Sequence, residues 1–127
     1  MDKQYTQQLK FTIQLHAIMM AGFAAIYIFL PVQWGNLTGC LSNEVPQVFR
    51  MFGTAIFGLA VMSALAYREN SWEGIKVVVQ ANVILNIIFP IMILLGIFLW
   101  GLPSIAWLYF VVMTGFGIAF TYFYTKA

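Results

Sequence analysis

Three amide side chains and a proline interrupt one of the most apolar stretches of the sequence, Gln80 to Pro90 (QANVILNIIFP). Asn82 and Asn86 are four residues apart and face the same way on a helix, whereas Gln80 points well away from both. An amide both donates and accepts hydrogen bonds, so in a membrane it can join two helices or hold the polar head of a lipophilic molecule. Both interpretations of the asparagines stay open, and in the first of them Asn86 compensates for Pro90.

His16 is the only histidine in the chain, which excludes two histidine axial ligands to haem within one chain. A single ligand without partners also makes a poor metal site. By the 1.5 Å rise per helical residue, His16 is expected at roughly the depth of Asn82. His16, Asn82 and Asn86 therefore define a candidate polar pocket in the inner half of a helical bundle. As an ionisable group inside a membrane, His16 either contacts a ligand or proton, or simply reaches interfacial water near Lys10.

Arg50 is the fourth candidate ligand-binding residue. It lies near the outer end of its predicted helix, where it either binds an anionic head group, pairs with Glu44, or extends its charged end to the interface. The single cysteine, Cys40, cannot form an internal disulfide, and pairing between chains stays open. No metal-binding cluster, cysteine pair or catalytic constellation occurs in the sequence. We therefore expect a non-enzymatic role without a metal, and a quinone is the one cofactor that stays open.

The composition places these residues in a membrane. Of 127 residues, 62% are hydrophobic and 8% are charged, whereas about a quarter of the residues of a globular domain are charged. A hydrocarbon core of roughly 30 Å needs about 20 apolar residues per helix, and the chain contains four such runs. The sequence predicts an antiparallel bundle of four transmembrane helices in a single domain, 1–127, with helices at about 10–31, 46–67, 72–99 and 103–124 and an outer loop at 32–45.

Basic residues near the helix ends predict the orientation. Most fall on one side of the membrane (Lys3, Lys10, Arg68, Lys76 and Lys126), and only Arg50 falls on the other. The positive-inside rule then puts both termini in the cytoplasm. A net charge of +2 is too small and dispersed to indicate nucleic acid. The first apolar run, Phe11 to Leu30, is too long for a signal peptide and is expected to stay in the membrane.

Proline and small residues indicate how the helices pack. Pro90 has no amide hydrogen, so the carbonyl of Asn86 loses its usual partner and a kink is expected in the third helix. Small residues recur at helical spacing on the first, second and fourth helices, where they allow close approach of another helix. The predicted packing positions are Ala17, Ala21, Gly53, Ala60, Ala64 and Gly117.

The succession LHAIMMAGFAAIYIFLP and then RMFGTAIFGLAVMSALAYRENSWEGIKVVVQ resembles a group of small uncharacterised bacterial and archaeal membrane proteins, broadly DoxX-like. The distinctive parts are Pro31, the Arg50 to Ala60 segment with Gly53, and Arg68 followed by Ser71-Trp72-Glu73. The resemblance implies a four-helix fold in a prokaryotic plasma membrane. Because some DoxX-like proteins are subunits linked to quinone-dependent sulfur oxidation, it also makes quinone the first lipophile to consider. It carries over no catalytic residue.

The sequence therefore favours an accessory membrane subunit that contacts membrane lipids and self-associates or docks to a larger membrane complex. The alternative is a quinone- or lipid-binding protein that uses the polar pocket in the inner half of the bundle. The two differ in whether His16 and Asn82 meet, which depends on helix rotations that the sequence does not reveal.

Overall fold

The part of the chain that the structure describes, residues 3–39 and 46–127, is built of helices and short connections. The computed structural model has four long helices and one short one: α1 (Lys3–Phe29), α2 (Pro31–Thr38), α3 (Pro46–Arg68), α4 (Trp72–Trp100) and α5 (Ile105–Lys126). Each long helix contains a stretch long and apolar enough to cross a membrane. The all-α prediction with four spans is confirmed, and the protein is a small multi-span membrane protein.

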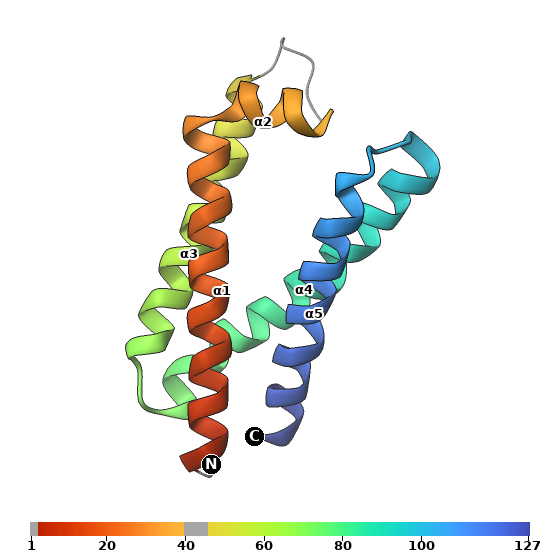
Figure 1. The fold of residues 1–127 in the computed structure, drawn as a ribbon. Helices are drawn as coiled ribbons and strands as arrows, with labels where there is room; N and C mark the ends of the chain where they lie inside the picture. Colours follow the sequence, from red (N-terminus) through yellow and green to blue (C-terminus); the bar gives the residue numbers. More distant parts are fainter. Residues whose placement is uncertain (1–2, 40–45) are drawn as a thin grey trace.

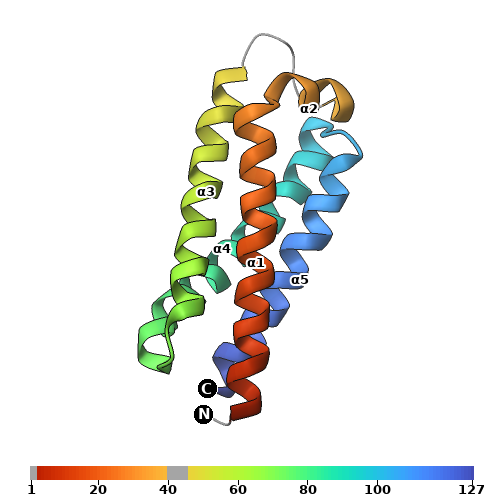
Figure 2. The same cartoon turned by 60° about the vertical axis from the view of Figure 1, so that its left-hand side comes forward.

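The long helices form two antiparallel pairs. α1 packs on α3 along most of its length, and α4 packs on α5, whereas contacts between the two pairs are sparse (Figure 1). Both termini lie at the end of the molecule where α3 turns into α4, and α2 lies at the opposite end, as Figures 1 and 2 agree. In Figure 1 the pairs lie closest at the end with the termini and diverge toward α2.

The helix α2 differs from the outer loop predicted at 32–45. Pro31 stands at its first turn, where the fixed φ of proline suits a helix, and Gly39 ends it with a left-handed φ of 73°. The amide of Gly39 donates to the carbonyl of Gly35 at 2.8 Å. Residues 40–45 lie outside the described part of the chain, so the predictions about Cys40 and about an Arg50–Glu44 pair fall outside it as well.

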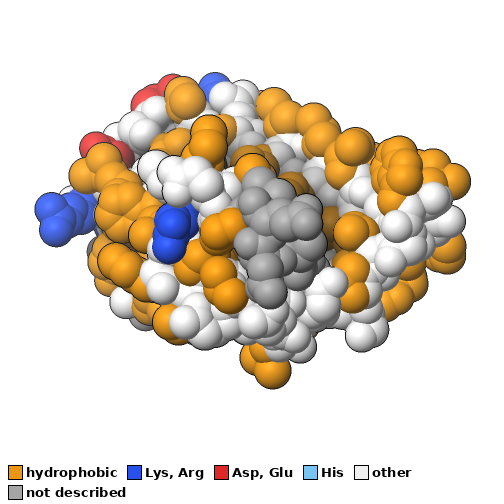
Figure 3. Space-filling view, turned by 90° about the horizontal axis from the view of Figure 1, so that it is seen from above, with side chains coloured by type: hydrophobic (Ala, Val, Ile, Leu, Met, Phe, Trp, Pro, Cys, Tyr) orange, Lys and Arg blue, Asp and Glu red, His pale blue; other side chains and the backbone are white. Residues whose placement is uncertain are grey.

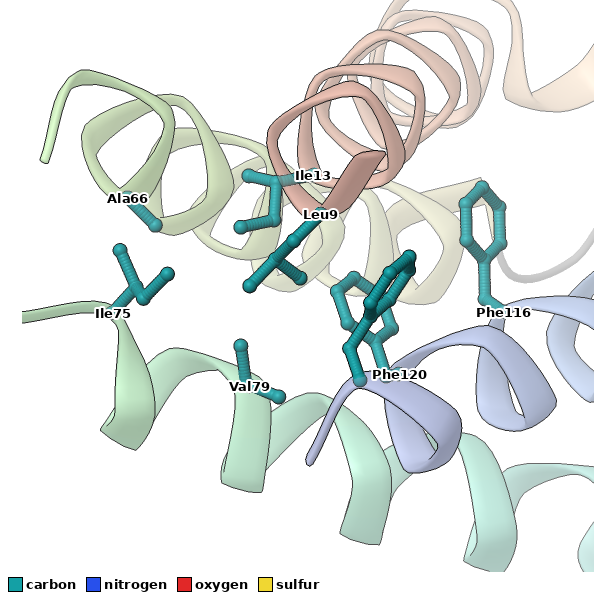
Figure 4. Close-up of a cluster of buried hydrophobic side chains, with 8 residues drawn as sticks. Leu9, Ile13, Ala66, Ile75, Val79, Phe116 and Phe120 are labelled. Atoms are coloured by element: carbon teal, nitrogen blue, oxygen red, sulfur yellow. The ribbon is translucent and has the colours of Figure 1, made fainter. Parts of the chain in front are cut away.

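Two buried clusters explain where the pairs meet and where they part. The first draws apolar side chains from all four long helices near the end with the termini: Leu9, Ile13, Ala66, Ile75, Val79, Phe116, Phe120 and Phe123 (Figure 4). The second contains buried residues of α1 and α3 only: Met20, Ala24, Tyr27, Ile56 and Ala60. Fully buried residues therefore join the two pairs at one end, whereas further along the buried residues come from α1 and α3 and the partly buried Tyr109 and Met113 of α5 pack against them.

The outer surface is apolar. In the most apolar window of each span no more than 28% of the residues are buried, and Phe29 and Phe98 are about three-quarters exposed, at 76% and 73%. Viewed from the α2 end, hydrophobic side chains gather around the sides of the molecule and charged ones appear at few points (Figure 3). Such a surface is suited to hydrocarbon rather than water.

Gly53 sets the distance between α1 and α3. A Cβ placed on Gly53 would lie 2.8 Å from the Cβ of Tyr27 and 3.2 Å from the backbone nitrogen of Ile28. Carbon atoms do not approach so closely, so the absence of a side chain lets the two helices pack backbone to backbone.

α4 is helical without interruption from Trp72 to Trp100, with Pro90 inside it. The kink expected at Pro90 stays a prediction. The carbonyl oxygen of Asn86, which Pro90 leaves without its i+4 amide, faces Gly117 of α5, because a Cβ on that glycine would lie 2.7 Å from it. The missing amide of α4 and the missing side chain of α5 thus fall at the same crossing point.

The turn between α3 and α4 is held by Glu69. Its carboxylate accepts hydrogen bonds from the amides of Asn70 at 2.9 Å and Ser71 at 3.2 Å and from the Ser71 hydroxyl, while Ser71 Oγ accepts from the amide of Gly74. Ser71 is therefore the cap of α4. Lys10 of α1 donates to the side chain of Asn70, which ties this turn to the first helix.

Acid should weaken this turn. The hydrogen bond from the Asn70 amide, followed by those from Ser71, holds the pKa of Glu69 below its ordinary value of 4.5. A carboxyl whose pKa is depressed on folding stabilises the fold above that value and ceases to do so as pH falls through the folded pKa. We expect wild type to lose its stability advantage over Glu69→Ala as pH falls from about 6 to about 3 in thermal unfolding. A difference that is independent of pH would contradict this account.

Candidate functional site

A cavity of about 210 Å³ lies between the α1–α3 pair and the α4–α5 pair, and all four long helices line it. The lining side chains are aliphatic, aromatic or thioether groups apart from two phenol hydroxyls: Met20, Phe23, Tyr27, Phe52, Ala55, Ile56, Leu59, Leu85, Phe89, Tyr109, Val112 and Met113. An apolar cavity of about 150 Å³ already stays free of water and admits a benzene ring. This cavity is large enough for a ring or a short length of hydrocarbon chain.

The cavity opens between α3 and α4. Of its lining residues only Phe52 and Ala55, both on α3, are exposed. Phe52 stacks on Phe89 of α4 with the rings nearly parallel, at 11°, and their centroids 6.4 Å apart. These rings bridge the gap between the two pairs at the opening, which we call the α3–α4 mouth.

A hydrogen-bonded aromatic cluster also borders the cavity, and its Tyr27 packs edge-on against Phe52, with ring centroids 5.5 Å apart. The Tyr27 hydroxyl donates to the Tyr109 hydroxyl at 2.8 Å, and the indole N–H of Trp34 in α2 donates to the same oxygen at 2.9 Å. Phe23 packs edge-on against Tyr109, with ring centroids 5.6 Å apart. The cluster links α1, α2 and α5 beside a cavity wall that is almost wholly apolar.

His16 lies in the interior but does not line this cavity. It is completely buried, its Nδ1 is hydrogen-bonded to Ser63 Oγ of α3 at 2.9 Å, and its Nε2 is buried with no hydrogen-bond partner among the described residues. The rings of Phe116 and Phe120 stand nearly perpendicular to the imidazole at centroid distances of 4.9 and 5.4 Å. His16 therefore joins α1 to α3 and packs against α5.

Removing the partner of His16 should destabilise the α1–α3 pair. Ser63→Ala leaves both imidazole nitrogens without a protein partner, and we expect a loss of about 1 kcal/mol, since hydrogen bonds between membrane helices contribute roughly 0.6 to 1.7 kcal/mol. The measurement is the unfolding free energy in mixed micelles. In a His16→Leu background the same change should cost much less, and an equal cost in both backgrounds would show that the pair is not coupled.

Asn82 and Asn86 form a ladder along α4. The Asn82 Nδ2 donates to the carbonyl of Val78 at 2.9 Å, and the Asn86 Nδ2 donates to the carbonyl of Asn82 at 2.8 Å. Both asparagines are buried, and the Oδ1 of each is without a hydrogen-bond partner in the described part of the chain. His16 and Asn82 are thus not hydrogen-bonded to each other, and neither lines the cavity.

The other candidate residues lie apart from this interior. Arg50 is exposed near the start of α3. Gln80, which the helical spacing directs away from the asparagines, donates to the hydroxyl of Tyr124 at 2.9 Å.

Among the predicted packing residues, the structure buries some and leaves others at the surface: Gly53, Ala60 and Gly117 are buried, Ala17 is half-buried, and Ala21 and Ala64 are exposed.

Sequence reasoning passes over the residues that form the cavity. Phe23 and Tyr27 are expected only as packing or lipid-facing side chains, and Tyr109 has no expected role in a site. Tyr27 lies near the end of α1 and Tyr109 near the start of α5. Tyrosines near helix ends are typical of the interfacial aromatic belt, so the sequence carries no clear signal of a polar contact between them. The pairing with Tyr109 depends on the fold, because 82 residues separate the two.

Comparison of the chain with protein-family models, with curated proteins and with solved structures gives no match in any of the three. The DoxX-like resemblance therefore stays a prediction, and the function must be inferred from the geometry of the cavity.

Proposed function

We propose that the protein is a non-enzymatic membrane protein that holds a lipophilic molecule in the cavity between its two helical pairs. The cavity itself supports this proposal, since all four spans line it and its wall is almost entirely apolar. Inside a bilayer the ligand gains little from leaving lipid. It gains the van der Waals contacts that the lining side chains lack around an empty cavity.

The lining favours a flat ring or an unsaturated chain with a polar head. Aromatic faces and methionine sulfur atoms contact π systems well. Tyr27 and Tyr109 line the cavity and carry hydrogen-bonded hydroxyls, which a head group reaches once it displaces one of these bonds. A quinone or a lipid satisfies both requirements, and these remain the first candidates.

The ligand enters sideways from the bilayer through the α3–α4 mouth. The exposed lining residues, Phe52 and Ala55, lie there, and the Phe52–Phe89 stack is the barrier that a ligand must displace. Aromatic side chains change rotamer quickly compared with the movement of whole helices, so exchange does not require the pairs to separate.

The proposed orientation places both termini and the α3–α4 turn in the cytoplasm. Lys10, Arg68 and Lys76 lie near that end, in accord with the positive-inside rule. Trp72 and Trp100, the first and last residues of α4, suit the two interfaces. The α2 end and its aromatic cluster then face outward.

Self-association or docking to a larger complex is the second candidate function. Gly22 and Ala25 of α1, Gly58 of α3 and Gly115 of α5 are exposed, and a Cβ on any of these glycines would meet nothing within 4 Å. Small exposed residues let a further helix approach closely. Protein in nanodiscs should then run as an oligomer or retain partners, and a clean monomer would rule this candidate out.

Native mass spectrometry combined with lipid extraction tests the ligand-binding proposal. Wild-type protein released from mild detergent should carry one apolar molecule per chain, identified after extraction. Chains that emerge without any bound molecule, from several detergents and expression hosts, would contradict it.

A further inference from the structure

A second hollow lies on the α4–α5 pair, separate from the cavity. This α4–α5 groove has a volume of about 420 Å³ and is lined by residues of those two helices, among them Asn86, Pro90, Thr114, Gly117 and Thr121. Exposed isoleucines of both helices form its rims, so it opens toward the bilayer. Most of its wall is apolar, and few polar atoms contribute to it.

Two buried oxygens on residues that line this groove have no hydrogen-bond partner among the described residues. They are Oδ1 of Asn86, a residue that is only 2% exposed, and Oγ1 of Thr114. The orientation of the Asn86 amide is fixed, because its Nδ2 donates to the carbonyl of Asn82 and a carbonyl can only accept. The free Oδ1 is therefore an acceptor, and what it lacks is a donor.

These atoms lie too deep in the membrane for water, the usual hydrogen-bond donor, to reach them. Asn86 is 14 residues from each end of α4 (86 − 72 and 100 − 86), or roughly 21 Å at 1.5 Å per residue. That is the middle of a hydrocarbon core about 30 Å thick, where water is scarce. An acyl chain could fill the groove, but it has no group to donate, and an unpaired polar group in hydrocarbon is costly.

We infer that the α4–α5 groove binds a lipophile that carries a hydroxyl group at mid-bilayer depth, and that this hydroxyl donates to Asn86 Oδ1 beside Thr114. A free lipophilic phenol or alcohol can reach this depth. The hydroxyl of a glycerolipid is tied to the interface, so it cannot. This site does not depend on the cavity between the pairs, which is lined by other residues.

A matched pair of probes tests the donor directly. Nonylphenol and its methyl ether have nearly the same shape, but only the phenol can donate. In nanodiscs of phosphatidylcholine, which has no hydroxyl of its own, the wild-type protein should bind the phenol about fivefold more tightly than the ether, from the strength of one interhelical-type hydrogen bond. Binding is read from probe adducts counted by native mass spectrometry. Equal binding of the two probes would overturn the inference.

Threonine variants show whether the preference arises in this groove. In the proposed site Thr114 Oγ1 shares the hydroxyl proton with Asn86 Oδ1. Thr114→Val, which keeps the shape of the side chain, should therefore reduce the preference for phenol while leaving ether binding nearly unchanged. Thr121→Val, in the same groove two turns along α5, should keep the preference. Asn86→Leu should abolish it, but this change also removes the bond within α4, so Thr114→Val carries the test if that variant does not fold. A preference unaffected by Thr114→Val would contradict the site.

Added diacylglycerol distinguishes the two sources of a hydroxyl. Its hydroxyl lies at the interface, so we expect it not to displace the phenol. Displacement by diacylglycerol at equal mole fraction would overturn the assignment of a mid-bilayer ligand.

Discussion

Replacement of Gly117 by alanine is expected to lower the unfolding free energy by about 1 to 3 kcal/mol, the usual cost of forcing extra atoms into a packed contact. The added Cβ would lie 2.7 Å from the carbonyl oxygen of Asn86 and 3.3 Å from its Cβ. The first of these atoms belongs to the backbone and cannot rotate away. α4 and α5 must therefore move apart along the contact that holds their pair together.

Gly115→Ala is the matched control for this change. Gly115 lies two residues away on the same helix and is exposed, and a methyl group added there would meet nothing within 4 Å. Alanine has the higher helix propensity, so this variant should be neutral or slightly more stable. Unfolding of both variants in mixed micelles, followed by circular dichroism, gives the comparison. Equal stability of the two would show that α4 and α5 do not cross at Gly117.

Ala55→Phe is expected to reduce ligand retention at least tenfold, about 1.4 kcal/mol of binding free energy, while the bundle still assembles. Ala55 is one of the two exposed residues of the cavity lining, at the α3–α4 mouth. A phenylalanine ring there occupies the opening and competes with the ligand for the same space. Since Ala55 already borders open volume, the larger side chain need not displace a neighbouring helix.

Ala64→Phe controls for the added hydrophobic bulk. Ala64 is exposed on the same helix but does not line the cavity. Protein with this change should keep the wild-type amount of bound ligand, measured as apolar molecules per chain after extraction. If both variants lose the ligand, or neither does, the ligand is not held in this cavity.

The spans could be predicted from sequence because hydrocarbon imposes a simple rule. Each of the four runs is long enough to cross a bilayer, and none could remain exposed to water. The sequence predicts a loop where the short helix α2 lies, although Pro31 and Gly39 are typical signals for the start and end of a helix. Its glycines and asparagine are typical of a loop. The hydrogen bond that Trp34 makes joins α2 to Tyr109 of α5, which is distant in sequence.

Helix rotation limited the prediction of the site. The sequence pattern on α1 separates a face of mostly small residues (Gln14, Ala17, Ala21, Ala24 and Ala25) from a second face (His16, Met20, Phe23 and Tyr27). In the structure the second face is buried or half-buried, whereas only Ala24 of the first is buried. The sequence could not show that Ser63 would meet His16, because that contact depends on how α3 is turned and how far along α1 it sits.

The cavity was beyond prediction for a related reason. It exists because the two pairs share a core near the termini and diverge beyond it, so the space between them is set by four helices at once. A candidate pocket built from polar residues alone therefore pointed to His16 and Asn82. The structure surrounds the open volume with aromatic and aliphatic side chains instead.

Photolabelling with a diazirine-bearing fatty acid in nanodiscs tests the central claim most directly. Met20 lines the cavity and is 1% exposed, whereas Ile18 of the same helix is 62% exposed. The acyl chains of the bilayer should label Ile18 in any case. We expect adducts on Met20 as well, lost in Ala55→Phe while those on Ile18 persist. Adducts on Ile18 with none on Met20 would show that no lipophile enters the cavity.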